Sequence, residues 1–187
     1  VLRWMGVAGP PGLLERLERF EGWLAAEGAD AGGIGPAELP DLWERHVLDS
    51  IMFGFEAGSP TRIVDLGSGA GLPGIPLALL FPSAEVMLVD RSGRRVRLAR
   101  RAARVAGAAN VSVVQAGFGE LPPQEADLVV MRASLPLDDA PAVLAAHRAE
   151  GGRAVLGVGL TRPEGLACTR FPGSGILDPG RWLHIMR

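Results

Sequence analysis

The chain of 187 residues lacks several sequence features that are typical of particular classes of protein. Its single cysteine, Cys168, excludes an internal disulfide and a zinc site built from several cysteines. No apolar run is long enough to span a membrane, and residues 1–15 carry no secretory signal pattern. These absences lead us to expect a cytoplasmic globular protein, without a metal site.

Lysine is absent too, so all 19 basic residues are arginines. The formal net charge of −2 gives by itself no reason to expect a nucleic-acid partner. The arginines are unevenly spread, however: residues 62–110 hold eight arginines and three acids, whereas residues 1–61 hold four arginines and ten acids. Most of this positive charge falls in residues 91–104, where one helix face could hold RNA phosphates or could simply be solvated. That face consists of Arg94, Arg97, Arg101 and Arg104.

Apolar residues recur with two different periods along the chain. Helical spacing predicts one amphipathic helix over residues 12–27 and a second from about residue 37 or 40 to 56, separated by a glycine-rich loop at 28–36. From residue 61 on, short apolar strands alternate with helices, which is typical of a parallel sheet covered on both faces. We expect strands at 62–66, 85–90, 111–115, 127–131 and 153–156, helices at 74–81, 92–107 and 138–149, and a closing antiparallel pair at 167–171 and 182–186.

The most informative segment is the glycine loop Asp65-Leu66-Gly67-Ser68-Gly69-Ala70-Gly71, which follows the first strand. Glycines at a strand end allow a nucleotide to approach the backbone closely. The pattern Gly69-x-Gly71-x-x-Gly74 matches a dinucleotide site, and Gly67-x-Gly69-x-Gly71 matches a methyltransferase site. The acid Asp65 favours the second, because a carboxylate repels a pyrophosphate but attracts the cationic S-adenosylmethionine.

A second acid supports a nucleoside site. Asp90 ends the second strand, about 20 residues past the glycine loop, where a carboxylate can accept hydrogen bonds from ribose hydroxyls. The other interpretation of Asp90 is a solvated strand end or helix cap. Glu120, in the loop after the third strand, is a candidate for the adenine amine or an exposed acid. The fold class indicated is a class I S-adenosylmethionine-dependent methyltransferase: an N-terminal helical extension over 1–60 and a Rossmann-like domain over 61–187, forming one structural unit.

The stretch 63–78, and above all Leu72-Pro73-Gly74-Ile75-Pro76, resembles the RsmG (GidB) family of ribosomal RNA small-subunit methyltransferases G. Residues 42–50 also look like the helix that precedes the sheet in that family, and the resemblance covers roughly residues 12–157. It implies S-adenosylmethionine as cofactor, methylation of N7 of guanine 527 in 16S rRNA, and the small ribosomal subunit or its precursor as partner of a monomeric enzyme. It also implies cofactor contacts at Gly67, Leu72, Asp90, Gly119, Glu120 and Arg132.

With the residues of the glycine loop added, the cofactor site predicted from the sequence is Asp65, Gly67, Gly69, Gly71, Leu72, Asp90, Gly119, Glu120 and Arg132. Two positions depart from the family pattern: Phe118 and Val158 stand where the family usually has basic residues. For this reason two alternatives stay open. One is a small-molecule methyltransferase of the same fold, and the other is an inactive cofactor-binding or interaction protein.

Guanine N7 carries a lone pair and no proton, so its methylation requires orientation and no general base. Arg132, after the fourth strand, is the candidate for positioning the substrate; otherwise it forms a salt bridge to Asp138, Asp139 or Glu120. His46 and Asp49 lie three residues apart on one predicted helix face. They suggest either a catalytic pair or a pair that packs the N-terminal helix over the cofactor cleft.

Overall fold

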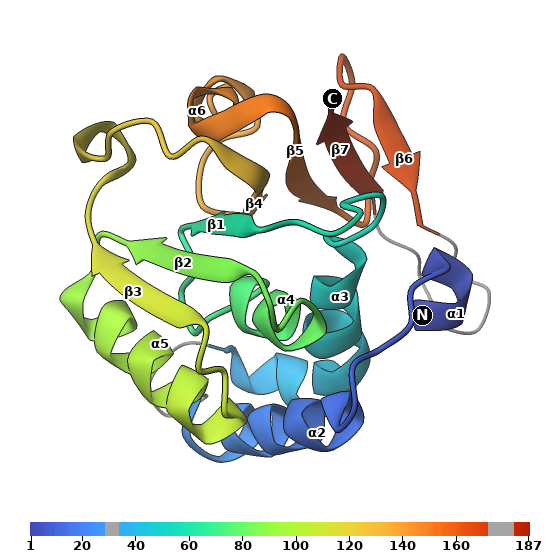
Figure 1. Ribbon diagram of the computed structural model, residues 1–187, viewed down its shortest axis with the longest axis vertical. Coiled ribbons are helices and arrows are strands. Elements are labelled where there is room, and N and C mark those ends of the chain that lie inside the picture. Colours follow the sequence, from blue (N-terminus) through green and yellow to red (C-terminus); the bar gives the residue numbers. More distant parts are fainter. Residues whose placement is uncertain (29–33, 172–181) are drawn as a thin grey trace.

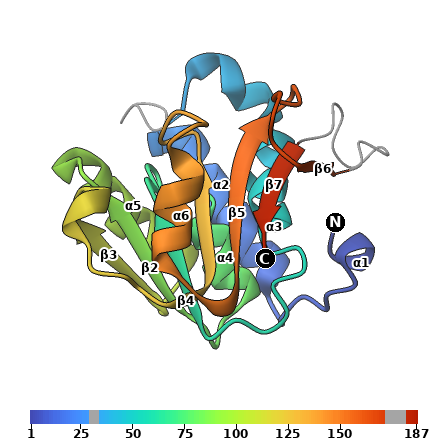
Figure 2. The same cartoon turned by 90° about the horizontal axis from the view of Figure 1, so that it is seen from above.

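The computed structural model describes residues 1–28, 34–171 and 182–187 and shows a single mixed sheet flanked by helices (Figures 1 and 2). The strand order is β3-β2-β1-β4-β5-β7-β6, with the first five strands parallel and β7 antiparallel to both β5 and β6. The strands are β1 (Arg62–Leu66), β2 (Glu85–Asp90), β3 (Val111–Gln115), β4 (Ala126–Arg132), β5 (Arg148–Gly159), β6 (Cys168–Arg170) and β7 (Trp182–Met186). The predicted, mostly parallel sheet and the closing antiparallel pair are confirmed.

Six α-helices are described: α1 (Leu2–Met5), α2 (Leu13–Trp23), α3 (Asp49–Met52), α4 (Gly74–Leu80), α5 (Gly93–Ala106) and α6 (Ala140–His147). The helices expected at 12–27, 74–81 and 92–107 are confirmed within a few residues, with a π-turn at Leu24–Gly28 continuing α2. α6 is shorter than expected because β5 already begins at Arg148. Of the glycine-rich loop expected at 28–36, residues 29–33 lie outside the described residues.

The regular helix predicted from about residue 37 or 40 to residue 56 is wrong. The chain forms a 3-10 helix at Pro36–Asp41, a π-helix at Trp43–Leu48 and then the short α3. Pro40 lies inside the first of these and has no N–H to donate, so a continuous α-helical ladder cannot run through it. After α3 the chain turns, with a hydrogen bond from Gly54 N–H to Ile51 C=O of 3.0 Å. A Cβ on Gly54 would lie 3.0 Å from Phe81 Cε2 and 3.3 Å from Leu77 Cδ2, so this turn is tightly packed.

Alternating strand residues point to two separate apolar layers. Ile63, Leu88 and Leu128 face a large cluster that also contains residues of α2, α4 and α5, so the N-terminal helices share their core with the sheet. Val64 and Val129 face a smaller cluster on the other side, where α6 is the only helix described (Figure 2). Both layers lie against nearly continuous apolar strands, as a parallel sheet requires. Within the described ranges, no helix has both the length and the apolar character to cross a bilayer.

Candidate functional site

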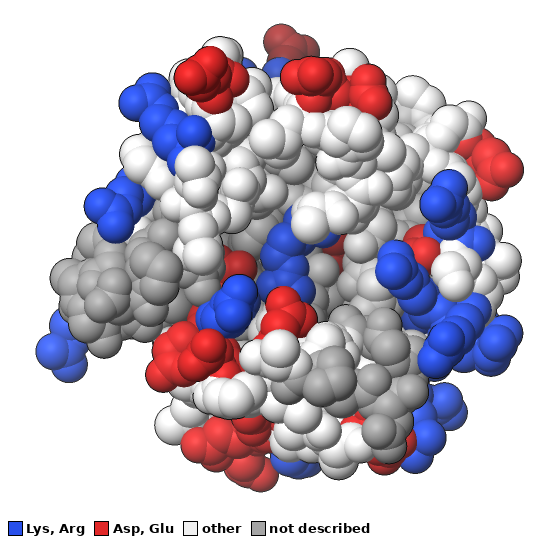
Figure 3. All heavy atoms as spheres, turned by 180° about the vertical axis from the view of Figure 1, so that it is seen from behind, with Lys and Arg blue, Asp and Glu red and all other residues white. Residues whose placement is uncertain are grey.

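A cavity of about 1180 Å³ opens where β1, β2, β4 and β5 end. Ligands of open α/β sheets bind at this edge, beyond the carboxyl ends of the strands. Figure 3 shows the hollow with arginine and acidic side chains around it. One side, which we call the glycine-loop wall, consists of Gly67, Ser68, Gly69, Ala70, Leu72 and Asp90. The opposite side, the N-terminal wall, consists of Glu38, Arg45, His46, Asp49 and Phe53.

The glycine loop owes its path to contacts with its neighbours. Gly67 has a φ of +78°, and its N–H donates to Val89 C=O at 2.8 Å. A Cβ on Gly67 would overlap the Ser134 side chain, whose hydroxyl lies 3.1 Å from the Gly67 carbonyl oxygen. Gly69 has a φ of +57°, but its missing Cβ would face open space. The first glycine is therefore required by packing, whereas the second leaves room for a ligand beside the backbone.

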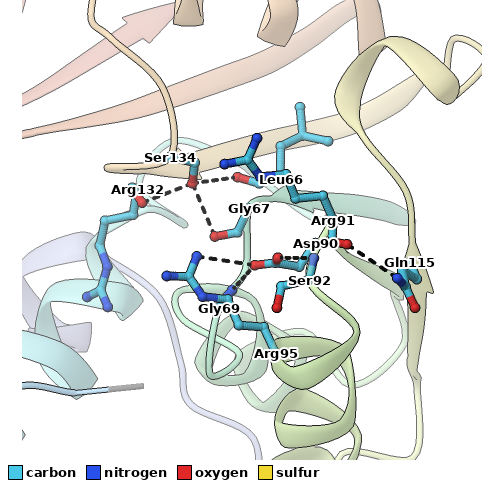
Figure 4. A network of polar contacts seen from close by, with 10 residues as sticks. All are labelled: Leu66, Gly67, Gly69, Asp90, Arg91, Ser92, Arg95, Gln115, Arg132 and Ser134. Atoms are coloured by element: carbon cyan, nitrogen blue, oxygen red, sulfur yellow. Dashed lines mark hydrogen bonds and ion pairs between the residues drawn. The ribbon is translucent and has the colours of Figure 1, made fainter. Parts of the chain in front are cut away.

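Asp90 joins the loop to α5 (Figure 4). Its Oδ2 accepts a hydrogen bond from Gly69 N–H at 3.1 Å and lies 3.7 Å from Arg95 Nη1, and its Oδ1 accepts from Ser92 N–H at 2.9 Å. Ser92 occupies the N-cap position of α5, but its side chain makes no capping bond. Asp90 is almost fully buried yet lines the cavity. Its carboxylate oxygens have further lone pairs, which could accept from two vicinal hydroxyls.

Asp65 lies behind the loop instead of at its mouth. It is completely buried, does not line the cavity, and accepts a hydrogen bond from Gly74 N–H at 2.8 Å through Oδ2. Burial raises the pKa of Asp65 to about 7, although the Gly74 N–H opposes the rise. A Cβ on Gly74 would lie 2.7 Å from Asp65 Oδ2, so Gly74 is the residue that lets the acid reach the start of α4. Whether Asp65 also favours a cationic ligand stays a prediction.

Arg132 reaches from the end of β4 to the N-terminal wall. Its Nη1 lies 3.7 Å from Asp49 Oδ2, and its Nη2 lies 3.3 Å from His46 Nδ1. His46 Nε2 in turn lies 3.6 Å from Glu38 Oε2. The carboxylate near Arg132 is therefore that of Asp49, and no described ion pair joins Arg132 to Asp138, Asp139 or Glu120. Burial lowers the pKa of the Arg132 guanidinium, and the Asp49 carboxylate opposes that effect.

The predicted site residues thus divide into two groups. The cavity brings together Gly67, Gly69, Leu72, Asp90 and Arg132. By contrast, Asp65, Gly71, Gly119 and Glu120 do not belong to its lining. The Glu120 carboxylate instead accepts a bond from Gly117 N–H at 2.7 Å and closes the short turn Phe118–Glu120. Contacts of this second group with a cofactor stay predictions.

Sequence reasoning missed several residues of the cavity. Glu38 and Phe53 line the cavity without any sequence pattern that indicates it, whereas His46 and Asp49, predicted as a catalytic pair or as a pair packed over the cofactor cleft, do lie at the cavity. No sequence pattern indicates that Ser134 contacts the glycine loop. Ser134 follows Ala133, which adopts a φ of +51°, and the sequence does not predict this backbone conformation. The two residues that depart from the family pattern, Phe118 and Val158, also line the cavity.

The cavity fits an adenosyl ligand with an amino-acid tail. Gly69 leaves its backbone accessible, Asp90 offers a carboxylate for the ribose, and Phe118 gives an apolar surface for a base. One buried polar atom of the loop, Ser68 Oγ, has no hydrogen-bond partner among the described residues, and Ser68 lines the cavity. Buried polar atoms are normally paired, so its state is consistent with a ligand-binding loop. Among the described residues, no group of three metal-ligating side chains is present.

Comparisons with known proteins identify relatives with matching sequence and fold. The GidB family model, rRNA small subunit methyltransferase G, matches residues 13–169. The ribosomal RNA small subunit methyltransferase G of Mycobacterium marinum is 41% identical over 129 residues, which are 67% of this chain and 56% of the relative. The protein of the same name from Paramagnetospirillum magneticum is 39% identical over 140 residues, 74% of this chain and 67% of the relative. The matched region is thus between about half and two thirds of these relatives' length.

The fold has solved counterparts as well. A crystal structure of an S-adenosylmethionine-dependent methyltransferase from Aquifex aeolicus aligns with a TM-score of 0.58 and 15% identity, covering 78% of this chain and 92% of that one. At this identity the likeness concerns the fold, which is the class I Rossmann-like methyltransferase fold expected from the sequence. From the extent of the family match and the identity to its members, the chain belongs to the GidB family of rRNA small subunit methyltransferases G.

Proposed function

We propose that this protein transfers a methyl group from S-adenosylmethionine to N7 of a guanine in 16S rRNA, at position 527 as the family resemblance implies. The proposal rests on one observation: the glycine loop, Asp90, Arg132 and the N-terminal wall all line the same cavity. Such a cavity has one side for an adenosyl cofactor and another for the group that receives the methyl. Membership of the GidB family supports the choice of substrate.

The glycine-loop wall would hold the cofactor. Gly69 provides backbone that a ligand can approach, and Asp90 accepts from the ribose hydroxyls while Gly69 and Ser92 fix its carboxylate. Leu72 and Phe118 supply apolar surface. S-adenosylmethionine, when bound, supplies an electrophilic methyl on a positively charged sulfur. The remaining task of the protein is to bring the acceptor into line with that methyl.

Guanine N7 attacks with its own lone pair, so no residue has to remove a proton first. Arg132 on the acceptor side is a cation that cannot act as a base, and the Asp49 carboxylate lies beside it. The role that this reaction leaves to Arg132 is therefore binding and orientation of the base.

We propose α5 as the surface that holds the RNA backbone. Its fourteen residues include six exposed arginines and no acid, an arrangement in which like charges repel at helical spacing. Figure 3 shows arginine side chains gathered on the side of the molecule where α5 lies. Arg91 and Arg95, at the start of the helix, line the cavity. Phosphates of an RNA strand could thus follow α5 toward the site. The substrate would be a small ribosomal subunit or its precursor in the cytoplasm.

Methyl transfer can be measured directly on the intact chain. Small ribosomal subunits from cells that lack N7-methylguanine at this position would be incubated with the protein and labelled S-adenosylmethionine, and the modified guanine mapped by chemical strand scission. We expect label at one guanine, and loss of label in Asp90→Ala with weaker S-adenosylhomocysteine binding. Glu44→Gln, an exposed acid outside the cavity lining, serves as control. Cofactor binding without transfer to rRNA would contradict the substrate and favour the small-molecule alternative. Absence of cofactor binding by the folded protein would favour an inactive interaction protein.

The role of α5 has its own test. Arg94→Glu should weaken binding of a 16S rRNA fragment, and the slope of its affinity against salt concentration should decrease by about one phosphate contact. Arg19→Glu, an exposed arginine of α2, is the matched control because its side chain is 53% exposed and pairs only loosely with Glu15 at 4.0 Å. Equal losses in both proteins would show that net charge, and not this helix, governs binding.

A further inference from the structure

The N-terminal wall and the end of β4 are joined by a chain of polar contacts that the transfer of a methyl group does not by itself require. The contacts run from Asp49 to Arg132, from Arg132 to His46, and from His46 to Glu38, at 3.7, 3.3 and 3.6 Å. The four residues come from four different elements: Pro36–Asp41, Trp43–Leu48, α3 and β4. All four line the same cavity, so a ligand there meets a cation and two carboxylates together.

The backbone of Arg132 is fixed to the glycine loop, whereas its side chain points away from it (Figure 4). Ser134 Oγ lies 3.2 Å from Arg132 C=O and 3.1 Å from both Leu66 C=O and Gly67 C=O. The guanidinium extends to the N-terminal wall, and 20% of its side-chain surface is exposed. A guanidinium has five N–H donors, so it can keep its contacts with Asp49 and His46 and still donate to a ligand.

The carboxylates differ in exposure. The Asp49 side chain is 10% exposed and lies next to the guanidinium, whereas the Glu38 side chain is 38% exposed. Glu38 is also held in place, because its Oε2 accepts a hydrogen bond from Gly35 N–H at 3.1 Å. Asp49 is thus placed to orient Arg132, and Glu38 to meet a group that enters from solvent.

Guanine has hydrogen-bonding groups that match this arrangement. O6, beside N7, accepts a hydrogen bond, and the opposite edge carries the donors N1–H and N2–H. Adenine has a donor at the position of O6 and an acceptor at N1, so the same cation and carboxylate would meet groups of the wrong kind. Methylation at N7 also moves the positive charge from sulfur to the purine. A carboxylate at the purine edge stabilises that charge as it develops.

We propose that Arg132 and Glu38 form a guanine-recognition site: Arg132 donates to O6 and leaves N7 free, and Glu38 accepts from N1–H and N2–H. Asp49 and His46 are positioning residues that hold the two recognising side chains. The inference rests on the proposed function for the identity of the base. It adds a reason for the irregular N-terminal segment, whose 3-10 and π turns bring Glu38 and His46 to the cavity.

The test removes a hydrogen bond from the protein and from the RNA separately. A 16S rRNA fragment carries either guanine or inosine, which lacks the N2 amine, at the target position. We expect wild-type protein to transfer methyl to the inosine RNA about 10-fold more slowly, as for loss of one charge-assisted hydrogen bond. Glu38→Gln should slow transfer to guanine RNA by about 10-fold and bring the two RNAs to nearly equal rates. The Gln side-chain oxygen can still accept from Gly35 N–H, which limits any effect on folding.

Glu44→Gln, in the next turn of the chain and outside the cavity lining, should leave the preference for guanine unchanged. If Glu38→Gln slows both RNAs by the same factor, Glu38 is only structural and the inference is overturned. A second measurement does not depend on methyl transfer: binding of guanosine and adenosine monophosphates to the protein saturated with S-adenosylhomocysteine.

The two proposals can fail separately. Preference for the guanosine nucleotide that disappears in Glu38→Gln, in a protein that methylates no rRNA, would keep the recognition site and overturn the rRNA function. Methylated rRNA with no effect of Glu38→Gln on either the inosine comparison or the nucleotide preference would keep the function and overturn the recognition site. If the wild-type protein shows neither methylation nor nucleotide preference, both are overturned.

Discussion

The two walls of the cavity are built in opposite ways. The glycine-loop wall is a short regular turn, held by backbone bonds such as those from Gly67 and Ser68 N–H to Val89 C=O at 2.8 and 3.0 Å. The N-terminal wall changes helix type twice, and its polar side chains contact Arg132 at 3.3 and 3.7 Å. The first wall depends on backbone geometry and the second on side-chain charge. Mutations should therefore damage them differently.

The glycine-loop wall should be the more sensitive to a single methyl group. In Gly67→Ala the new Cβ overlaps the Ser134 side chain at a φ of +78°, so we expect S-adenosylhomocysteine affinity, measured by calorimetry, to fall by about 100-fold or more. Gly58→Ala is the matched control, because Gly58 also has a positive φ of +66°, lies outside the cavity lining and has no atom within 4 Å of its Cβ position. Adding Ser134→Gly to Gly67→Ala should recover part of the loss, which separates the overlap from a general failure to fold. Equal affinity for Gly67→Ala and wild type would show that the loop does not hold the cofactor.

The N-terminal wall should respond instead to the loss of a charge. Asp49→Asn leaves the largely buried Arg132 without its nearest carboxylate, and we expect the free energy of unfolding to fall by about 2–3 kcal/mol in urea titrations. Asp41→Asn is the control: its ion pair with Arg45 at 3.8 Å has side chains 39% and 59% exposed, so its loss should cost less than about 0.5 kcal/mol. Similar costs for both substitutions would mean that the Asp49–Arg132 pair is effectively solvated.

Gly157 is where the N-terminal wall meets the sheet. A Cβ there would lie 2.7 Å from Phe53 Cζ and 3.5 Å from Arg132 Cγ, and only the end of a side chain has to move. We expect Gly157→Ala to slow methyl transfer by about 10-fold while changing S-adenosylhomocysteine affinity by less than about 3-fold. Phe53→Leu in the same chain should restore most of the rate. A loss of cofactor affinity as large as the loss of rate would show that the two walls are not independent.

A difference in the pH dependence of stability concerns the acid behind the glycine loop. The pKa of Asp65 rises from 3.8 to about 7 in the folded protein, so between these pH values the folded state holds a proton that the unfolded state has released. This carboxyl therefore makes stability fall as pH rises from about 4 to 7, by less than about 1.4 kcal/mol per pH unit, the limit for one proton. Urea unfolding of Asp65→Asn should lack this contribution and still keep an acceptor for Gly74 N–H.

Asp127→Asn provides the contrast with Asp65→Asn. Hydrogen bonds from the hydroxyl and N–H of Thr61 hold the pKa of Asp127 below its usual value. Its stabilisation is complete above the pKa of the unfolded chain and is lost only as pH falls through the folded value. Removing it should lower stability without changing the slope between pH 5 and 7. An unchanged slope in Asp65→Asn would mean that Asp65 is ionised throughout this range.

The same contrast between the walls explains what the sequence could predict. Strand and helix positions from residue 61 on follow from short apolar strands that alternate with helices. Gly67 and Gly69 follow from the local pattern after β1, and Asp90 from its position at the end of β2. The role of Asp65 could not be predicted from the sequence. Asp65 is hydrogen-bonded to Gly74, which is nine residues away along the chain but adjacent in space. The N-terminal wall did not follow either. Its residues meet Arg132 from 83 and 86 positions away, and no local period encodes such a contact.

The unequal cover of the sheet has a consequence for motion. Three buried residues, Ala140, Leu144 and His147, attach α6 to its face, whereas α2, α4 and α5 together cover the other. Detaching α6 therefore costs less free energy than opening the opposite face, and in native-state hydrogen exchange its amides should exchange among the first of the described helices. Met131 and Leu156 lie beneath it, immediately before Arg132 and Gly157. Loosening of α6 would thus uncover the strands that end at Arg132 and Gly157, on the acceptor side of the cavity.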